Sequence, residues 1–175
     1  MIKKSNEAEQ SAIEQVANLM AAAARTAPKT CGIDNIQVLI LTEGDIKKLT
    51  PKMIEISIRD KRPSCDRDGH NIEKVQVCVI IGVKSNPPGL NCGFCGFKTC
   101  EELKKAGGIC AFNSMDLGIA LSSACGIASQ FHIDNRLMYS IGRAALELGL
   151  LDKGIKQAIG IPLSATGKNI FFDRK

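Results

Sequence analysis

The chain has 175 residues, of which 45% are hydrophobic and 23% are charged, and this composition is typical of one soluble globular domain. Its net charge of +5 comes from scattered basic residues, and with one Tyr and no Trp it offers little aromatic surface on which bases could stack, so we expect no nucleic-acid binding. No apolar run reaches the roughly 20 residues of a membrane span, and the polar start Met1–Gln10 has no signal-peptide core, so we expect a cytoplasmic protein that does not bind membranes.

The first half of the chain alternates between helical and extended patterns. Apolar residues recur at helical spacing over 6–26, which predicts the first helix. A β-branched run over 36–42 predicts a strand, and a second helix is expected at about 45–59, with Pro51 as a candidate interruption. The charged segment 60–72 predicts a loop. Valine and isoleucine then dominate 74–84, which predicts a buried strand.

The second half begins with a turn at Pro87-Pro88-Gly89 and a short helix expected at about 98–106. A long helix rich in small residues is predicted over 114–131, with Asn113 as its cap. Such a helix packs closely, either in a core or across a dimer interface. The remaining segments predict strands at 136–141 and 156–163 and a short helix at 143–149. Together these elements predict a single α+β domain over residues 1–175.

Eight cysteines are the unusual feature of the composition. Four of them form the pattern C-x2-C-x4-C-x9-C: Cys92, Cys95, Cys100 and Cys110. In a reducing compartment, clustered cysteines indicate a metal site more often than disulfides. Four thiolates can hold one 4Fe–4S cubane, with one thiolate on each iron, and Gly93 and Gly96 can bring backbone amides close to it. A structural zinc site is the alternative, although zinc sites commonly use two closely spaced cysteine pairs.

The run from Cys92 to Cys100 resembles the four-cysteine module of the corrinoid iron–sulfur protein. In that module the fourth cysteine usually lies further along the chain, so Cys125 is an alternative to Cys110 as the fourth ligand. Free cysteines are commonly buried, and we expect Cys125 to lie in the core of the long helix instead.

The wider chain is identified as a member of a family of small, uncharacterised ferredoxin-domain proteins. The resemblance rests on the cysteine run and on four further segments: 24–29, 34–35, 134–136 and 160–169. Membership implies an iron–sulfur cluster and implies no particular reaction.

The order of the elements is also similar to the FMN-dependent nitroreductase fold. The similarity rests on three short segments: Ala27-Pro28-Lys29-Thr30, Asp116-Leu117-Gly118 and Gly160-Ile161-Pro162. It implies a nitroreductase-like mixed sheet covered by helices, a homodimer, and an inserted cluster-binding segment at 85–112. The sequence departs from the family in lacking an arginine-rich start, since Met1–Gln10 holds only two lysines.

The nitroreductase resemblance also implies where FMN would bind. Arg25, Thr26 and Thr30 would line one side of the flavin, while Lys168 and Arg174 would hold its phosphate. The alternative for Arg25 is a helix-terminal cation favoured by the helix dipole, and the alternative for Arg174 is a solvated tail.

These patterns predict an iron–sulfur redox protein that acts in electron transfer or as a flavin-linked oxidoreductase of unknown substrate. Its partner would be a redox protein or a small-molecule substrate. Two alternatives stay open: a non-enzymatic iron–sulfur partner or sensor protein, and a zinc-stabilised structural protein.

Overall fold

The computed structural model describes residues 2–172. In chain order its elements are α1 (Ser5–Thr26), the 3-10 turn η1 (Thr30–Gly32), β1 (Ile36–Thr42), α2 (Glu43–Asp60), α3 (Pro63–Ile72), β2 (Val77–Lys84), α4 (Cys100–Lys105), α5 (Ala111–Gln130), β3 (Asp134–Asn135), α6 (Tyr139–Glu147) and β4 (Ile155–Ser164). Among the described residues, no helix combines the length and apolar character that crossing a membrane requires.

The four strands form one antiparallel sheet in the order β1-β2-β4-β3. Strand β2 is central, and all of its residues except Lys84 are buried. Its side chains alternate between two cores, since Val77, Val79, Ile81 and Val83 face one core while Cys78 and Ile80 face the other. This alternation follows from the two-residue period of a strand, and it explains why β2 is apolar throughout.

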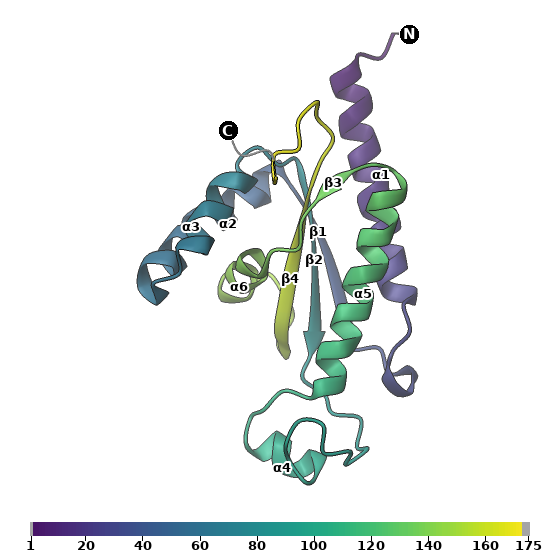
Figure 1. The fold of residues 1–175 in the computed structure, drawn as a ribbon, viewed down its shortest axis with the longest axis vertical. Coiled ribbons are helices and arrows are strands. Elements are labelled where there is room, and N and C mark those ends of the chain that lie inside the picture. Colours follow the sequence, from purple (N-terminus) through teal and green to yellow (C-terminus); the bar gives the residue numbers. More distant parts are fainter. Residues whose placement is uncertain (1, 173–175) are drawn as a thin grey trace.

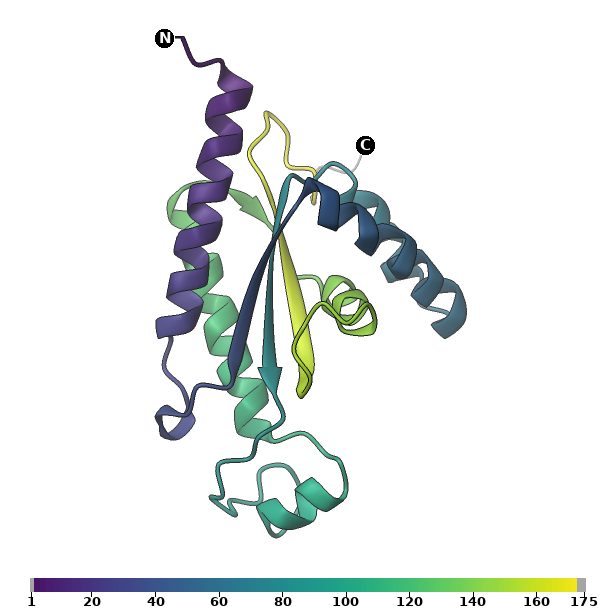
Figure 2. The ribbon, with the colours of Figure 1, turned by 180° about the vertical axis from the view of Figure 1, so that it is seen from behind.

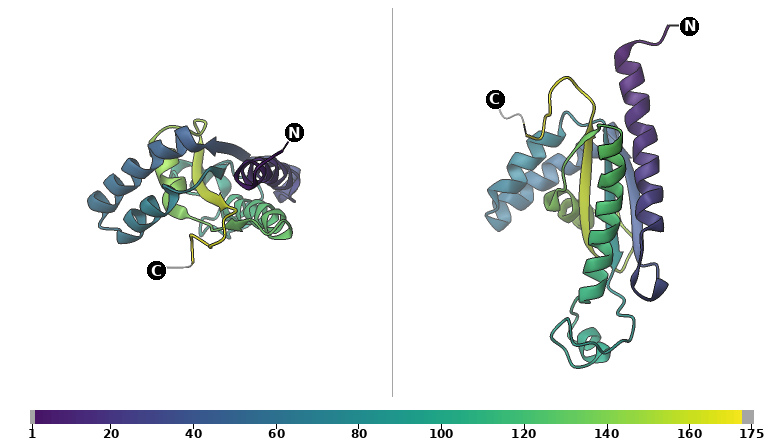
Figure 3. Two further views of the ribbon diagram at one scale, coloured as in Figure 1. Left: turned by 90° about the horizontal axis from the view of Figure 1, so that it is seen from above. Right: turned by 45° about the vertical axis from the view of Figure 1, so that its right-hand side comes forward.

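Helices cover both faces of the sheet (Figures 1 and 3). On one face α1 and α5 pack together through their alanine-rich inner sides. On the other face lie α2, α3 and α6. Helix α6 approaches β4 closely because each element has a glycine at the contact. A Cβ on Gly142 of α6 would lie 1.8 Å from the Ala158 oxygen, and a Cβ on Gly160 of β4 would lie 2.2 Å from Ile141 Cγ2.

The sheet has an insert end and a far end. At the insert end, Ile36 of β1 pairs with Val83 of β2, and Ile155 of β4 pairs with Lys84. The segment 85–112 projects from this end (Figure 2). At the far end, β1 closes with Thr42 and β4 closes with Ser164.

The charged segment after α2 is not a loop, contrary to the sequence prediction. Pro63 occupies the first turn of α3, where its missing N–H costs nothing. Cys65, Asp68 and Ile72 recur at helical spacing and are buried. The Asp68 carboxylate accepts a hydrogen bond from Ser140 of α6 at 2.6 Å and pairs with the neighbouring Arg67 at 2.7 Å, so the only buried charge on α3 is satisfied from both helices.

Two further expectations are wrong in their boundaries. The predicted strand at 136–141 is limited to Asp134–Asn135 plus a bridge from Met138 to Gly160, and Tyr139 already begins α6. The predicted cap of α5 lies inside the helix: Cys110 holds the N-cap position, and Asn113 is 1% exposed. Asn113 serves a different purpose at the base of the insert.

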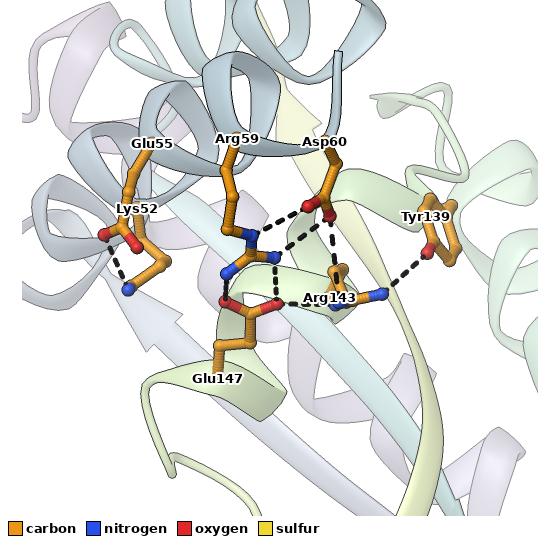
Figure 4. A network of polar contacts seen from close by, with 7 residues as sticks. All are labelled: Lys52, Glu55, Arg59, Asp60, Tyr139, Arg143 and Glu147. Atoms are coloured by element: carbon orange, nitrogen blue, oxygen red, sulfur yellow. Dashed lines mark hydrogen bonds and ion pairs between the residues drawn. The ribbon is translucent and has the colours of Figure 1, made fainter. Parts of the chain in front are cut away.

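A polar network joins the outer surfaces of α2 and α6 (Figure 4). Arg59 donates to both Glu147 carboxylate oxygens at 2.9 Å and also to Asp60. Arg143 donates to Glu147 at 2.6 Å. The hydrogen bonds from Arg59 and, to a lesser extent, Arg143 lower the pKa of Glu147 from 4.5 to about 2.

The lowered pKa of Glu147 predicts an acid-dependent stability. The ionised carboxylate stabilises the fold above its ordinary pKa, and this contribution is lost as the pH falls from 4.5 through about 2. We expect Glu147→Gln to lower the free energy of unfolding by about 1 kcal/mol at pH 7, a value discounted for solvent screening. Chemical denaturation at pH 7 and at pH 3 measures the difference, which should shrink at pH 3.

Glu14→Gln serves as the control for that experiment, because Glu14 is exposed on α1 and accepts one hydrogen bond from Gln10. It should have little effect at either pH. An unfolding free energy of Glu147→Gln that equals the wild-type value at pH 7 would contradict a stabilising role for the network.

Candidate metal centre

The insert 85–112 leaves β2 and returns directly into α5, and a group of asparagines ties its two ends together. The backbone N–H of Asn86 donates to Asn113 Oδ1 at 2.9 Å, and its side-chain Nδ2 donates to Asn35 Oδ1 at 3.2 Å. Asn35 and Asn113 are both buried. Because buried amides are costly when unpaired, this network fixes where the insert enters and leaves the domain.

All four predicted ligands line one pocket in this insert. Cys92 is exposed, Cys95 and Cys100 are half-buried, and Cys110 is 4% exposed. The other lining residues are uncharged: Pro88, Leu90, Asn91, Gly93, Phe97, Thr99, Ala111 and Phe112. The structure therefore brings together cysteines that are up to 18 positions apart (110 minus 92) in the sequence.

Four cysteine thiols are the ligands that a 4Fe–4S cluster needs, but the pocket between them is smaller than a cluster. Its volume is about 10 Å³, near that of one enclosed water, so the loop widens and the thiols turn if a cluster is held. Gly93 and Gly96 have positive φ and open space on their Cβ sides, which leaves room for this change. Within residues 2–172, no three Cys, His, Asp or Glu side chains converge as ligands of a single ion. A cubane is not a single point, because each thiolate binds a different iron.

Two helix N-termini point their positive ends toward the cysteines. Cys100 is the first residue of α4, and Cys110 is the N-cap of α5. A helix carries a partial positive charge at its N-terminus, so both ends favour anionic thiolates. The short helix predicted at about 98–106 accounts for the first of these ends, and the second belongs to α5, which begins earlier than predicted.

Local hydrogen bonds hold the loop in shape. The Gly96 N–H donates to the Gly93 carbonyl at 2.9 Å. A modified capping box encloses the third cysteine: the Glu102 N–H donates to Thr99 Oγ1 at the N-cap, while the return bond to Glu102 Oε2 comes from the Lys98 N–H, one residue before the N-cap, each at 3.2 Å. The T-x-x-E pattern of residues 99–102 is the sequence signal for this box, and it marks the start of α4.

Three phenylalanines of the insert cover the site unequally. Phe94 is 69% exposed and stacks on Phe112 with ring centroids 5.5 Å apart. Phe97 and Phe112 line the pocket. The insert therefore presents an apolar outer surface that includes Leu90, Phe94 and Ile109, instead of burying all three aromatic rings around the cysteines.

Cys125 lies far from this pocket. It follows Cys110 along α5, and at a rise of 1.5 Å per residue the two are separated by about 22 Å. Cys125 packs against the core between α5 and the sheet, and burial raises the pKa of its thiol. The structure thus groups Cys110, and not Cys125, with the other three cysteines.

The residues assigned to one side of a flavin lie at the insert end and are engaged within the fold. Arg25 donates to Asp34 at 2.5 Å and to the Ile36 carbonyl at 2.7 Å. Burial would raise the pKa of Asp34, but the Arg25 hydrogen bond and a backbone N–H together hold it below its usual value. Thr30 donates through both its N–H and its hydroxyl to the buried Asp116 carboxylate. Thr26 donates to the Ala22 carbonyl of its own helix.

The residues assigned to the flavin phosphate lie elsewhere. Lys168 follows β4 by four positions and is exposed at the far end of the sheet, while Arg174 lies outside the described residues. With seven residues in β1 and about 3.3 Å per residue, the two ends are about 20 Å apart. Within one chain, the structure therefore does not bring Lys168 together with Arg25, Thr26 and Thr30.

The location of Cys110 and Cys125 predicts different effects of removing each thiol. We expect Cys110→Ala to bind metal at least about tenfold more weakly, since even changes next to a ligand cost this much. Cys125→Ala should retain the wild-type metal content, because its thiol is about 22 Å from the pocket. Metal content per chain after anaerobic purification checks both variants, and the reverse pattern would make Cys125 the fourth ligand.

Comparisons with known proteins agree with this description. Residues 106–174 match the family model described as "Uncharacterized protein containing a ferredoxin domain", a stretch that includes Cys110. An uncharacterized protein of Archaeoglobus fulgidus is 40% identical over 171 residues, which is 93% of this chain and 91% of that protein. The likeness of the cysteine run to the corrinoid iron–sulfur protein stays a prediction.

Solved structures show the fold. Nitroreductase CinD from Lactococcus lactis, in complex with nicotinic acid, superposes with a TM-score of 0.63 at 12% identity, over 95% of this chain and 81% of that one. A nitroreductase with bound FMN from Desulfitobacterium hafniense gives 0.62 at 11%, over 89% and 79%. A BluB-like flavoprotein from Clostridium difficile gives 0.58 at 18%, over 90% and 86%. The predicted nitroreductase-like α+β class is thereby confirmed, and the chain belongs to the family of uncharacterized proteins containing a ferredoxin domain.

Proposed function

We propose that this protein binds a 4Fe–4S cluster through Cys92, Cys95, Cys100 and Cys110 and uses it in electron transfer. The observation that carries the proposal is the shared pocket: four cysteines, from two helix starts and a glycine-rich loop, line one small uncharged space. Membership of a ferredoxin-domain family supports it.

The arrangement favours iron–sulfur chemistry over structural zinc for two reasons. A zinc site that stabilises a fold contributes folding energy outright, whereas this insert already has its ends fixed by the asparagine network and its helix by a capping box. The positive φ values and open Cβ sides of Gly93 and Gly96 also let the backbone approach a cluster closely, and backbone N–H donors tune the potential of a cluster.

When bound, the cluster supplies single-electron chemistry, and the chain's own residues determine how that electron is exchanged. Phe97 and Phe112, which line the pocket, and the burial of Cys110 limit water at the site. The N-terminus of α5 stabilises negative charge there. The outer surface of Leu90, Phe94 and Ile109 offers an approach for a redox partner.

A flavin is a second candidate cofactor, favoured by the nitroreductase-like fold and by the FMN in one of its structural neighbours. Arg25, Thr26 and Thr30 lie about 20 Å from Lys168 in one chain, so one flavin could contact both groups only if they came from two chains. A flavin that contacted both groups would therefore require a dimer.

The outer face of α5 supports such a dimer. Its only charged residue, Asp116, is buried, and its exposed residues are Met115, Gly118, Ile119, Ser122, Gly126, Ser129 and Gln130. A helix without charge on its outer side is typical of a buried helix. The helix also runs the length of the sheet from the insert to β3 (Figure 1), so a two-fold axis across it would bring the insert end of one chain to the far end of its partner.

The first experiment is anaerobic purification followed by iron, sulfide, zinc and flavin analysis on one sample. We expect about four irons and four sulfides per chain and a broad brown absorption that reduction bleaches. Flavin bands in the same spectrum would support a flavin-linked oxidoreductase, and their absence would leave an electron-transfer or sensor protein. One zinc per chain, with no sulfide even after anaerobic reconstitution, would overturn the proposal and leave a structural zinc protein.

Dimerisation is tested by placing a charge on α5. Ile119 is 40% exposed on this helix, and Ile58 is 77% exposed on α2, on the other side of the sheet. We expect light scattering to report a dimer for the wild type and for Ile58→Asp, and a monomer for Ile119→Asp, because an unpaired carboxylate in an apolar interface is costly. A wild-type monomer at micromolar concentration would argue against the interface.

A further inference from the structure

Asn91 stands directly before the first cysteine and has an unusual backbone. Its φ is 48°, in the left-handed region that asparagine adopts more readily than most residues. Its side-chain oxygen accepts a hydrogen bond of 2.8 Å from the Cys100 N–H. Asn91 itself is exposed, so neither its burial nor an apolar contact explains this conformation.

This hydrogen bond closes the part of the loop that holds three of the four cysteines. Asn91 is bonded along the chain to Cys92, and its side-chain oxygen accepts the hydrogen bond from the backbone N–H of Cys100. Cys95 lies between them, within the turn that Gly93 and Gly96 form. The backbones of the first and third cysteines are thereby held at a set spacing by one side chain.

The bond also settles the start of α4. The Cys100 N–H belongs to the first turn of a helix, where amides have no partner within the helix. Thr99 satisfies the Glu102 amide, and Asn91 reaches from outside the helix to satisfy that of Cys100. The orientation of the third cysteine thus depends on a residue nine positions earlier (100 minus 91).

We propose that Asn91 is a positioning residue for the metal centre. It holds the backbones of Cys92 and Cys100 in place while the thiols turn and the loop widens to hold a cluster, and so slows the loss of that cluster. The inference rests on the proposed function as far as the cluster is concerned, whereas the effect of Asn91 on the Cys100 amide is independent of it.

Three substitutions separate the side-chain oxygen from the backbone conformation. Asn91→Asp keeps an acceptor and tolerates the left-handed region. Asn91→Gly adopts that region without strain and has no acceptor. Asn91→Ala lacks the acceptor and is also strained. Asn6→Ala, at an exposed asparagine on α1, is the control for removing an asparagine elsewhere.

Two measurements are made on the full chain, purified anaerobically. The first is the rate at which an iron chelator removes the cluster. We expect Asn91→Gly to lose it about tenfold faster than the wild type, since one neutral hydrogen bond is worth about that factor. Asn91→Ala should be at least as fast, Asn91→Asp should be slower than Asn91→Gly because its carboxylate still accepts the bond, and Asn6→Ala should stay within about twofold of the wild type.

The second measurement is hydrogen exchange at the Cys100 amide, which we expect to be about tenfold faster in Asn91→Gly than in the wild type. Wild-type rates of both exchange and cluster loss in Asn91→Gly would overturn the inference while leaving the iron–sulfur function intact. If the wild type holds no cluster, the proposed function fails, and the exchange rate alone decides whether Asn91 positions Cys100.

Discussion

The burial of β2 on both faces is the constraint on which the rest of the structure depends. Its valines at alternate positions pack under α1 and α5, and Cys78 and Ile80 between them pack under the helices of the opposite face. Because the strand pairs on both edges with β1 and β4, its backbone is also fully used. Cys78 is consequently inert: complete burial raises the pKa of its thiol to about 12, so it remains a protonated, apolar side chain.

The insert begins directly after this buried strand and ends where α5 begins. The scaffold thus separates two tasks. The core between the sheet and its helices supplies the stability, and the insert needs only local contacts to shape its loop: a capping box, the turn at Gly93 and Gly96, and the hydrogen bond from the Cys100 N–H to Asn91. A site that changes shape on binding a cofactor can do so without disturbing the apolar core.

Much of this could be predicted from sequence, and the reason is that the signals were local. The strand 36–42 has the predicted bounds because its β-branched run needs no partner to be recognised. The close spacing of Cys92, Cys95 and Cys100 likewise predicts their proximity. Helix α3 was missed because its buried side is made of Cys65, Asp68 and Ile72, a pattern whose meaning depends on Ser140 of a distant helix.

Other parts of the site depend on the path of the chain. Whether Cys110 or Cys125 joins the other cysteines is decided by where α5 begins, a boundary that the sequence prediction misplaced by a few residues. The separation of Lys168 from Arg25 follows from strand direction, on which composition and spacing are silent. Asn91 was missed because a lone asparagine carries no signal until its φ and its acceptor role are seen.

The hydrogen bond between Asn86 and Asn113 has a consequence for how such a protein could have arisen. It means that the insert begins and ends at nearly the same place, 2.9 Å apart between the two bonded atoms. A segment with coincident ends can be added to a scaffold, exchanged or removed without stretching the elements that flank it. We infer that the four-cysteine segment could be replaced by a short connection between β2 and α5 without stretching the sheet that carries it.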